Sequence, residues 1–252
     1  MRVLFIGDVF GTLGQKALKK YLPKLKQEHK PNLIFLNAEN IDRGFGLSEK
    51  IYKELMKDGI SLITMGNHTF RNKEIFEFIN DSKVIRPANY DESVPGVGYK
   101  TLKYNDKTVT VINLMGRVFM GDPLDNPFKI VDQILDEIDS DFVFIDFHGE
   151  ATSEKISFTH HVDGRVTAVV GTHTHVPTAD AMTFPKGTMY ITDIGMTGAK
   201  YGVLGADKDA QVHKFITGLR GRVVEQSEGP LQMNAVLIDT NTKKIKNINI
   251  YE

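Results

Sequence analysis

Side chains that can bind metal ions or transfer protons follow five of the apolar runs in this sequence. The last of these runs leads into "GTHTH", where a single residue separates His173 from His175. Carboxylate, carbonyl and imidazole groups are ligands for first-row transition metals, and imidazole also transfers protons near neutral pH. The complete set is Asp8, Glu39, Asn40, Asn67, His68, His148, His173 and His175. The set predicts metal-dependent chemistry if the fold brings its members together.

The apolar runs that precede these residues have the pattern of strands in a layered α/β fold. Several are apolar on both faces, as strands covered on both sides must be, and they alternate with helical patterns. We expect strands over residues 3–6, 33–36, 60–65, 109–114, 142–147, 166–170, 189–194 and 236–238. In an open α/β sheet, the loops after the carboxyl ends of the strands converge and bind ligands. The five polar clusters are therefore expected to meet in space.

Helix and turn signals between these runs support the same organisation. Ser48 can cap a helix that Gly59 would end, and Asn126 before a proline marks the start of another. The last segment, "NAVLIDTNTKKIKNINIYE", predicts a hairpin with a polar turn near residues 240–243. Because no linker or repeat divides the sequence, we expect one domain over residues 1–252, built on a mixed sheet or on two packed sheets.

Taken singly, several of these polar residues have ordinary structural interpretations. Asp8 could cap the helix that follows it, Asn67 could cap the next one, and His148 could be a half-buried histidine bonded to the backbone. The metal-ligand candidates of the set taken together, Asp8, Glu39, Asn40, Asn67, His148, His173 and His175, supply enough oxygen and imidazole ligands for two metal ions about 3.5–4 Å apart. Enzymes use this arrangement to displace groups at phosphorus. Glu39 is the candidate for a carboxylate between the ions.

The other histidines do not share this pattern. We expect surface or packing roles for the four that lie in or beside polar helical segments, His29, His160, His161 and His213. His68 adjoins Asn67, so its side chain would point away from the metals if Asn67 points towards them. It would then be free to donate a proton.

The composition restricts both the chemistry and the location. With no cysteine there can be no disulfide and no thiolate ligand, so a metal must be held by nitrogen and oxygen atoms. A formal net charge of -1 gives no overall attraction to polyanions, so a nucleotide must be held by a local site. The N-terminal segment lacks the features of a signal peptide, and no window approaches the ~18 apolar residues of a membrane span. We therefore expect a soluble, cytoplasmic protein.

Six ordered motifs carry a resemblance to a known superfamily. They are "GDVFG", "NAEN", "GNHTF", "DFHGEATSEK", "GTHTHVPTAD" and "TDIGMTG". In this order and spacing they resemble the calcineurin-like metallophosphoesterases, and most closely their bacterial YmdB-type branch, the 2′,3′-cyclic-nucleotide 2′-phosphodiesterases. The resemblance implies a four-layer sandwich of two mixed β-sheets flanked by helices. It also implies a hydrolase that uses two metal ions to cleave 2′,3′-cyclic nucleotides or other small phosphodiesters.

The resemblance further implies a role for each residue of the set. The implied ligands are Asp8 and His175 for the first ion, Asn67, His148 and His173 for the second, and Glu39 as the bridge between them. A water held between the ions would ionise near neutral pH and attack phosphorus as hydroxide. His68 would then protonate the leaving oxygen.

Two departures from the general superfamily pattern bear on the metal. The usual Asp-x-His after the first strand is here Asp8, Val9 and Phe10, which lacks the histidine, and the bridging aspartate is replaced by Glu39. Asn40 is placed to fill the missing position. Because a site with fewer imidazoles is harder, iron or manganese is expected rather than zinc.

Two alternatives of a different kind stay open from the sequence. Gly7, Gly11 and Gly14 after the first strand could belong to a nucleotide-binding α/β module, although they fit neither Gly-x-Gly-x-x-Gly nor the P-loop. The chain could also be a regulatory interaction protein of RNA turnover that keeps the metal fold. Nothing in the sequence decides whether it forms homo-oligomers.

Several side chains outside the ligand set could contact a substrate. The candidates for phosphate contacts are Arg43, Arg71 and Arg117, and those for stacking on a base are Phe45 and Tyr201. Ordinary surface roles for the arginines stay open, and so does packing against loop neighbours for the aromatic residues. A cyclic-nucleotide substrate is therefore implied mainly by the resemblance.

Overall fold

Alternate side chains of the first strand enter two different hydrophobic cores, and this alternation defines the layers of the fold. The computed structural model describes residues 1–219, 221 and 223–252 of the chain. In β1 (Arg2–Ile6), Val3 and Phe5 face one core while Leu4 and Ile6 face the other. Because successive side chains of a strand point to opposite faces, a strand that is apolar throughout must be covered on both sides.

The first sheet has eight strands and mixed pairing. Besides β1, its strands are β2 (Asp8–Val9), β3 (Leu33–Asn37), β4 (Leu62–Thr64), β5 (Val84–Ile85), β12 (Met196–Ala199), β13 (Leu231–Asp239) and β14 (Lys244–Tyr251). Parallel pairing joins β1 to β3, β3 to β4 and β4 to β5. β13 lies antiparallel to β1, β12 and β14, and the short β2 pairs parallel with β12.

The second sheet has six strands and is also mixed. They are β6 (Tyr99–Tyr104), β7 (Lys107–Met115), β8 (Phe142–His148), β9 (Ala168–Thr172), β10 (Met182–Thr183) and β11 (Met189–Ile191). The four central strands β7, β8, β9 and β11 run parallel, and β6 and β10 pair antiparallel at the two edges. The carboxyl ends of the four parallel strands therefore meet at one edge of this sheet.

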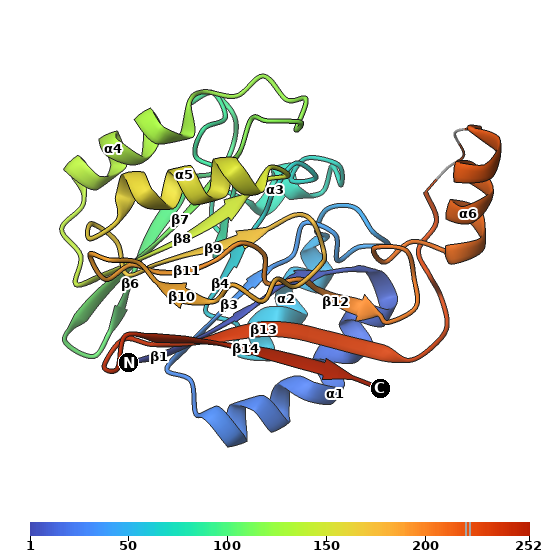
Figure 1. Cartoon of the computed structure of the whole chain (residues 1–252), viewed down its shortest axis with the longest axis horizontal. Helices are drawn as coiled ribbons and strands as arrows, with labels where there is room; N and C mark the ends of the chain where they lie inside the picture. The colour runs from blue at the N-terminus through green and yellow to red at the C-terminus, as the bar shows by residue number, and fades with distance from the viewer. Residues whose placement is uncertain (220, 222) are drawn as a thin grey trace.

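Helices cover the outer face of each sheet (Figure 1). α1 (Gly11–His29), α2 (Glu49–Lys57) and α3 (Ile75–Phe78) share a core with the first sheet, and α4 (Pro127–Glu137) and α5 (Thr152–Val162) share another with the second. A third core, which includes Phe5, Phe35 and Phe144, fills the space between the sheets. The expected four-layer α/β sandwich of two mixed sheets flanked by helices is thus confirmed. α6 (Lys208–Thr217) stands apart from these layers and buries no residue.

The predicted element signals are mostly confirmed, with shifted ends. Ser48 is the residue before α2, but its side chain makes no capping hydrogen bond. Asn126 caps α4 by accepting a hydrogen bond from the backbone N–H of Phe128 at 3.0 Å. The C-terminal hairpin is present as β13 and β14. The strand expected over residues 166–170 begins and ends two residues later, because its register with β8 pairs Thr172 with His148.

Two of the ordinary interpretations of the polar residues are wrong. The residue before α1 is Phe10, so Asp8 does not cap that helix. The helix after Asn67 is only the short α3, which is preceded by Glu74 and not by Asn67. Both side chains are therefore available for other contacts. In the part of the chain described, no helix is both long and apolar enough to cross a membrane.

Candidate metal centre

All eight predicted site residues lie at the carboxyl ends of strands and contact one another across the two sheets. Asp8 lies just beyond the carboxyl end of β1, where it is the first residue of the short β2. Glu39 and Asn40 follow β3, and Asn67 and His68 follow β4 of the same sheet. The three remaining histidines come from the second sheet, where His148 ends β8 and His173 and His175 follow β9. The polar side chains at the strand ends therefore converge as expected, although they come from two sheets rather than from one.

One group of ligand atoms surrounds His148 Nε2. Asn67 Oδ1 lies 3.0 Å from this nitrogen, His173 Nδ1 lies 3.1 Å from it, and Glu39 Oε1 lies 3.3 Å from it. One ligand atom each from Glu39, His148 and His173 lie within 4.8 Å of one another, which is close enough to share a metal ion. Four oxygen or nitrogen atoms with lone pairs therefore face a common point.

A second group of ligand atoms lies on the other side of Glu39. Asn40 Nδ2 is 3.0 Å from Glu39 Oε1 and 3.2 Å from His175 Nε2, and His175 Nε2 is 4.0 Å from Asp8 Oδ1. Asp8 is fully buried, and among the described residues nothing forms a hydrogen bond with its Oδ1. An unpartnered buried carboxylate oxygen is costly unless a cation or another donor meets it.

Each of the three histidines directs one ring nitrogen into the cluster and the other to an oxygen outside it. The outer contacts join His148 Nδ1 to Thr172 Oγ1 at 2.9 Å, His173 Nε2 to Glu150 Oε2 at 3.2 Å and His175 Nδ1 to Leu204 O at 2.9 Å. An outer acceptor of this kind places the proton on the outer nitrogen and leaves a lone pair on the inner one, as metal-binding histidines need. The donor set therefore fits metal binding by nitrogen and oxygen atoms.

The outer contact of His148 continues into a buried network. Thr172 Oγ1 donates to Asp146 Oδ1 at 2.6 Å, and Asn37 Nδ2 donates to Asp146 Oδ2 at 3.1 Å. Burial raises the pKa of Asp146, while His148 and these hydrogen bonds oppose that rise. The sequence interpretation missed Thr172 and Asp146. The available signal was a charged residue inside the apolar run over residues 142–147.

The backbone at the paired histidines is strained. His173 has a φ of 101° and His175 a φ of 67°, in the left-handed region that residues with a Cβ rarely adopt. The His173 N–H donates to Asp8 Oδ2 at 3.2 Å, which ties this backbone to the first sheet. Strained residues persist only where surrounding contacts hold them, and they concentrate at functional sites.

Gly66 passes unusually close to the cluster. A Cβ at this position would lie 2.4 Å from Glu39 Oε2 and 2.4 Å from His148 Nε2, both well below any real contact distance. Glycine is therefore required because the backbone itself forms a wall of the site. The sequence "GNH" contains this residue, but only the packing of the two sheets shows what it approaches.

The charges of the buried groups depend strongly on one another. Burial raises the pKa of Asp8 to about 6, with His175 and His148 acting in the opposite direction. Burial alone would raise the pKa of Glu39 and lower that of His148, but their mutual attraction lowers the first and raises the second to about 9. Burial and the charge of His148 lower the pKa of His173 to about 3. In the metal-free protein, a proton on His148 thus occupies the place where a cation would balance Glu39.

His68 lies inside the cluster rather than pointing away from it. Its Nδ1 is 2.7 Å from Asn40 Oδ1 and 3.6 Å from Glu39 Oε1, and its backbone N–H donates to Glu39 Oε2 at 2.9 Å. The expectation that the ring points away is wrong, because Glu39 and Asn40 draw both the backbone and the ring inward. The side chain is still 22% exposed, and burial lowers its pKa. The role of His68 as proton donor stays a prediction.

The candidate substrate contacts have different surroundings. Phe45 packs edge-on against His68 with ring centroids 5.1 Å apart, so it belongs to the rim of the site. Arg43 Nε pairs with Asp42 at 3.3 Å, and Tyr201 is 65% exposed. The backbone N–H of Arg117 donates to Glu154 at 3.0 Å. Substrate contacts by the arginines and by Tyr201 stay predictions.

The other histidines and the glycines of the first turn have structural surroundings. His160 packs on Phe184, and His161 Nε2 is 2.9 Å from Asp132 Oδ1. A Cβ at Gly7 would lie 1.8 Å from Gly195 O, so this glycine is needed for chain packing. His29 lies in the last turn of α1 and His213 on the exposed α6. Gly11 and Gly14 are likewise crowded, by Glu225 and by Thr197 O, so the spacing needs no nucleotide to explain it.

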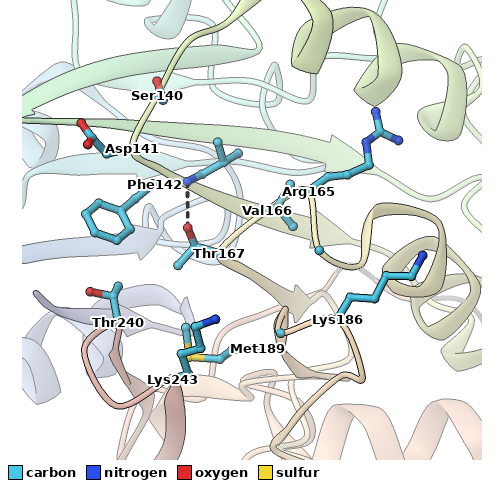
Figure 2. A pocket seen from close by; sticks show the side chains of 13 residues that line it. Ser140, Asp141, Phe142, Arg165, Val166, Thr167, Lys186, Met189, Thr240 and Lys243 are labelled. Atoms are coloured by element: carbon cyan, nitrogen blue, oxygen red, sulfur yellow. Dashed lines mark hydrogen bonds between the residues drawn. The ribbon is translucent and has the colours of Figure 1, made fainter.

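A separate cavity of about 270 Å³ lies at the opposite ends of the same strands (Figure 2). Its lining comes from the segments that lead into β8, β9 and β11 and from the β13–β14 turn, and it includes Arg165, Lys186 and Lys243. Arg165 Nη1 is paired with Asp132 at 2.7 Å. The ligand cluster lies beyond the carboxyl ends of β8 and β9, so this cavity is not part of the candidate metal centre.

Nearly the whole sequence matches a known family. The family described as "YmdB-like protein" matches residues 4–252. The chain belongs to the YmdB-like family. A similar protein in this family is the "2′,3′-cyclic-nucleotide 2′-phosphodiesterase" of Bacillus subtilis, which is 48% identical over 253 residues, 99% of this chain and 95% of that protein.

Two solved structures resemble this YmdB-like chain over its full length. One is a hypothetical protein from Thermus thermophilus, with a TM-score of 0.95, 38% sequence identity and complete coverage of both chains. The other is described as a novel phosphatase from Mycoplasma pneumoniae, with a TM-score of 0.93, 38% identity and coverage of 100% of this chain and 94% of that one. The fold and the family assignment therefore agree.

Proposed function

We propose that this YmdB-like protein is a metal-dependent phosphodiesterase that hydrolyses 2′,3′-cyclic nucleotides. The observation that carries the proposal is the position of Glu39 Oε1, which is 3.3 Å from His148 Nε2 and 3.0 Å from Asn40 Nδ2. One carboxylate thus faces both groups of ligand atoms, as a bridge between two cations must. The name of the Bacillus subtilis relative supports the substrate class.

The proposal assigns the ligand atoms to two ions. Asp8, Asn40 and His175 would hold the first ion, Asn67, His148 and His173 would hold the second, and Glu39 would be shared. To bind through Oδ1, Asn40 must turn its amide over, since Nδ2 now faces Glu39 and His175. Bound ions supply a Lewis acid for the phosphoryl oxygens and lower the pKa of water. The nitrogen and oxygen donor set, which lacks thiolate, favours iron or manganese.

His68 is the residue to which the proposal assigns proton donation. Opening of the cyclic ester breaks the bond between phosphorus and the 2′ oxygen, and that oxygen takes up a proton as it leaves. Once the Asn40 amide has turned over, its Nδ2 faces His68 Nδ1 at the position that Oδ1 holds 2.7 Å away. His68 Nδ1 then accepts a hydrogen bond, so Nε2 carries the proton of the ring and can supply it. Phe45 packs on the His68 ring and limits its rotation.

The test is a substrate panel assayed with manganese and with iron. Phosphomonoesters, linear diesters, and 2′,3′- and 3′,5′-cyclic nucleotides are compared, with chelator-treated protein as the control. The expected result is metal-dependent hydrolysis with a preference for 2′,3′-cyclic nucleotides and a 3′-monophosphate product. A metal-loaded protein that hydrolyses no phosphodiester would contradict the proposal.

Three finer expectations accompany this proposal. They are a cytoplasmic location, contacts with proteins of RNA turnover and assembly into homo-oligomers. A variant that folds but lacks the metal ligands separates the contacts with proteins of RNA turnover from catalysis, because a regulatory role by contact alone would survive the loss of activity.

A further inference from the structure

A buried ion pair lies behind the loop that carries His173 and His175. Lys155 of α5 and Asp193, two residues after β11, are both fully buried, and Lys155 Nζ is 3.1 Å from Asp193 Oδ2. A substrate cannot reach either side chain. They belong to the motifs "DFHGEATSEK" and "TDIGMTG", and the ligand set explains neither of these two residues.

The pair holds the two peptide units on either side of His173. Lys155 Nζ donates to Thr172 O at 2.8 Å, and Asp193 Oδ2 accepts from the backbone N–H of Thr174 at 3.0 Å. Peptide units are planar, so φ and ψ of one residue set only the angle between its two flanking units. Because both units are held by one rigid pair, the backbone conformation of His173 is held as well.

The other carboxylate oxygen of Asp193 holds the backbone that follows β11. Asp193 Oδ1 accepts from the backbone N–H of Gly195 at 2.8 Å, and the next N–H, from Met196, donates to His175 O at 3.2 Å. The loop between the two histidines is therefore tied at Thr172, Thr174 and His175. These are the positions at which a backbone with φ of 101° at His173 and 67° at His175 needs support.

Stability alone does not account for a buried pair of this kind. The desolvation of two charges offsets most of their attraction, and well-packed apolar replacements are often neutral or stabilising. The contacts of Lys155 and Asp193 go instead to the backbone between two metal-ligand candidates. Buried ionic groups can specify one conformation where several would otherwise compete.

We propose that Lys155 and Asp193 are positioning residues of the metal centre. They hold the strained loop so that His173 Nδ1 and His175 Nε2 face their separate ions. This inference rests on the proposed function, because it assigns the pair to the same site. It predicts that the pair controls metal affinity without touching a metal, as outer contacts of metal ligands commonly do.

The test removes both charges together, so that neither is left unpaired. In Lys155→Met/Asp193→Leu, Mn²⁺ is titrated into metal-free protein by calorimetry, and thermal unfolding of the metal-free protein is recorded in parallel. The expected variant folds with a lowered melting temperature, because the backbone groups of Thr172, Thr174 and Gly195 lose their partners. It binds Mn²⁺ about 10–100-fold more weakly than the wild type. With a cyclic nucleotide, kcat falls more than KM changes.

The control is a partly exposed ion pair at the opposite end of the strands. Lys107 and Asp141 lie 3.0 Å apart at the starts of β7 and β8. Lys107→Met/Asp141→Asn is expected to keep the Mn²⁺ affinity and kcat of the wild type. A general response to the loss of any ion pair would appear in both double variants.

The outcomes separate this inference from the proposed function. A folded Lys155→Met/Asp193→Leu variant with wild-type Mn²⁺ affinity overturns it. If that variant does not fold, Lys155→Gln, which keeps a donor but loses the charge, decides in the same way: weaker Mn²⁺ binding supports the inference and unchanged binding overturns it. A wild-type protein that binds Mn²⁺ but hydrolyses no phosphodiester contradicts the proposed function alone, because the affinities can still be compared.

Discussion

Glu39 Oε1 and His148 Nε2 come from different sheets and lie 3.3 Å apart. Glu39 follows β3 of the first sheet, and His148 is the last residue of β8 of the second. This contact brings the carboxyl ends of strands from both sheets together in one buried cluster. The proximity of Glu39 raises the pKa of His148 to about 9 although burial alone would lower it. The candidate metal centre therefore exists only because the two sheets pack together.

Replacing Glu39 with glutamine tests the bridge. Glu39→Gln keeps the size of the side chain but removes the charge that would balance two cations, so fewer than two ions per chain are expected. Elemental analysis of the purified variant measures the stoichiometry. Glu49→Gln, in an exposed pair with Lys53, is the control and should match the wild type. Two tightly bound ions in Glu39→Gln would rule out the bridging role.

Removal of the His68 side chain tests proton donation. His68→Ala keeps the backbone N–H that donates to Glu39, so it is expected to retain its metals. It should lose about 10²–10⁴-fold in kcat with an ester whose leaving group is poor, because proton donation matters most there. An ester with a good leaving group serves as the control and should show a much smaller loss. Undiminished activity on the poor leaving group would exclude His68 as the donor.

A methyl group at position 66 is expected to disrupt the cluster. In Gly66→Ala, the new Cβ would lie 2.4 Å from both Glu39 Oε2 and His148 Nε2, so one of these groups must move. We expect weaker metal binding and reduced activity, measured by Mn²⁺ titration and by turnover. Gly221→Ala is the control, since a Cβ there meets no described atom within 4 Å. Normal metal affinity in Gly66→Ala would show that the ligands do not depend on this close approach.

Metal binding should release protons. The pKa of His148 is raised from 6.5 to about 9 in the metal-free protein, so its proton stabilises the metal-free fold below about pH 6.5, and this contribution is lost as the pH rises through 9. A cation must displace that proton at neutral pH. The apparent Mn²⁺ affinity should therefore rise by up to about tenfold per pH unit between pH 7 and 9.

Asp8 adds a second proton at lower pH. Burial raises its pKa to about 6, so below that value metal binding must displace protons from both groups and the dependence on pH should steepen. Calorimetric titrations in two buffers of different ionisation enthalpy count the released protons directly. An apparent affinity that does not change with pH would contradict a protonated His148 in the metal-free state.

The strand ends and their polar residues could be predicted from the sequence because they depend on local pattern. Apolar runs of strand length, alternating with helical periodicity, place Asp8, Glu39, Asn67, His148 and His173 after strands without reference to any partner. Asn126 as a helix cap is equally local, since its contact reaches only two residues along the chain.

Other features depend on contacts between residues far apart in the sequence. The His68 ring lies inside the cluster because Glu39 and Asn40, on another strand end, draw it there. The cap expected of Asn67 is absent for the same reason, because Asn67 Oδ1 contacts His148 Nε2 of the other sheet and Glu74 precedes α3.

What the sequence alone determined is the layered α/β class, the order of the strands' polar ends and the nitrogen and oxygen chemistry of the site. What only the tertiary structure decided is which atoms meet: the outer oxygen on each histidine, the close approach of Gly66 and the support of His173 by Lys155 and Asp193. The physical reason is the distance along the chain over which each kind of interaction acts. Periodicity and capping act over a few residues, whereas the site forms where two sheets bury charges from opposite parts of the chain.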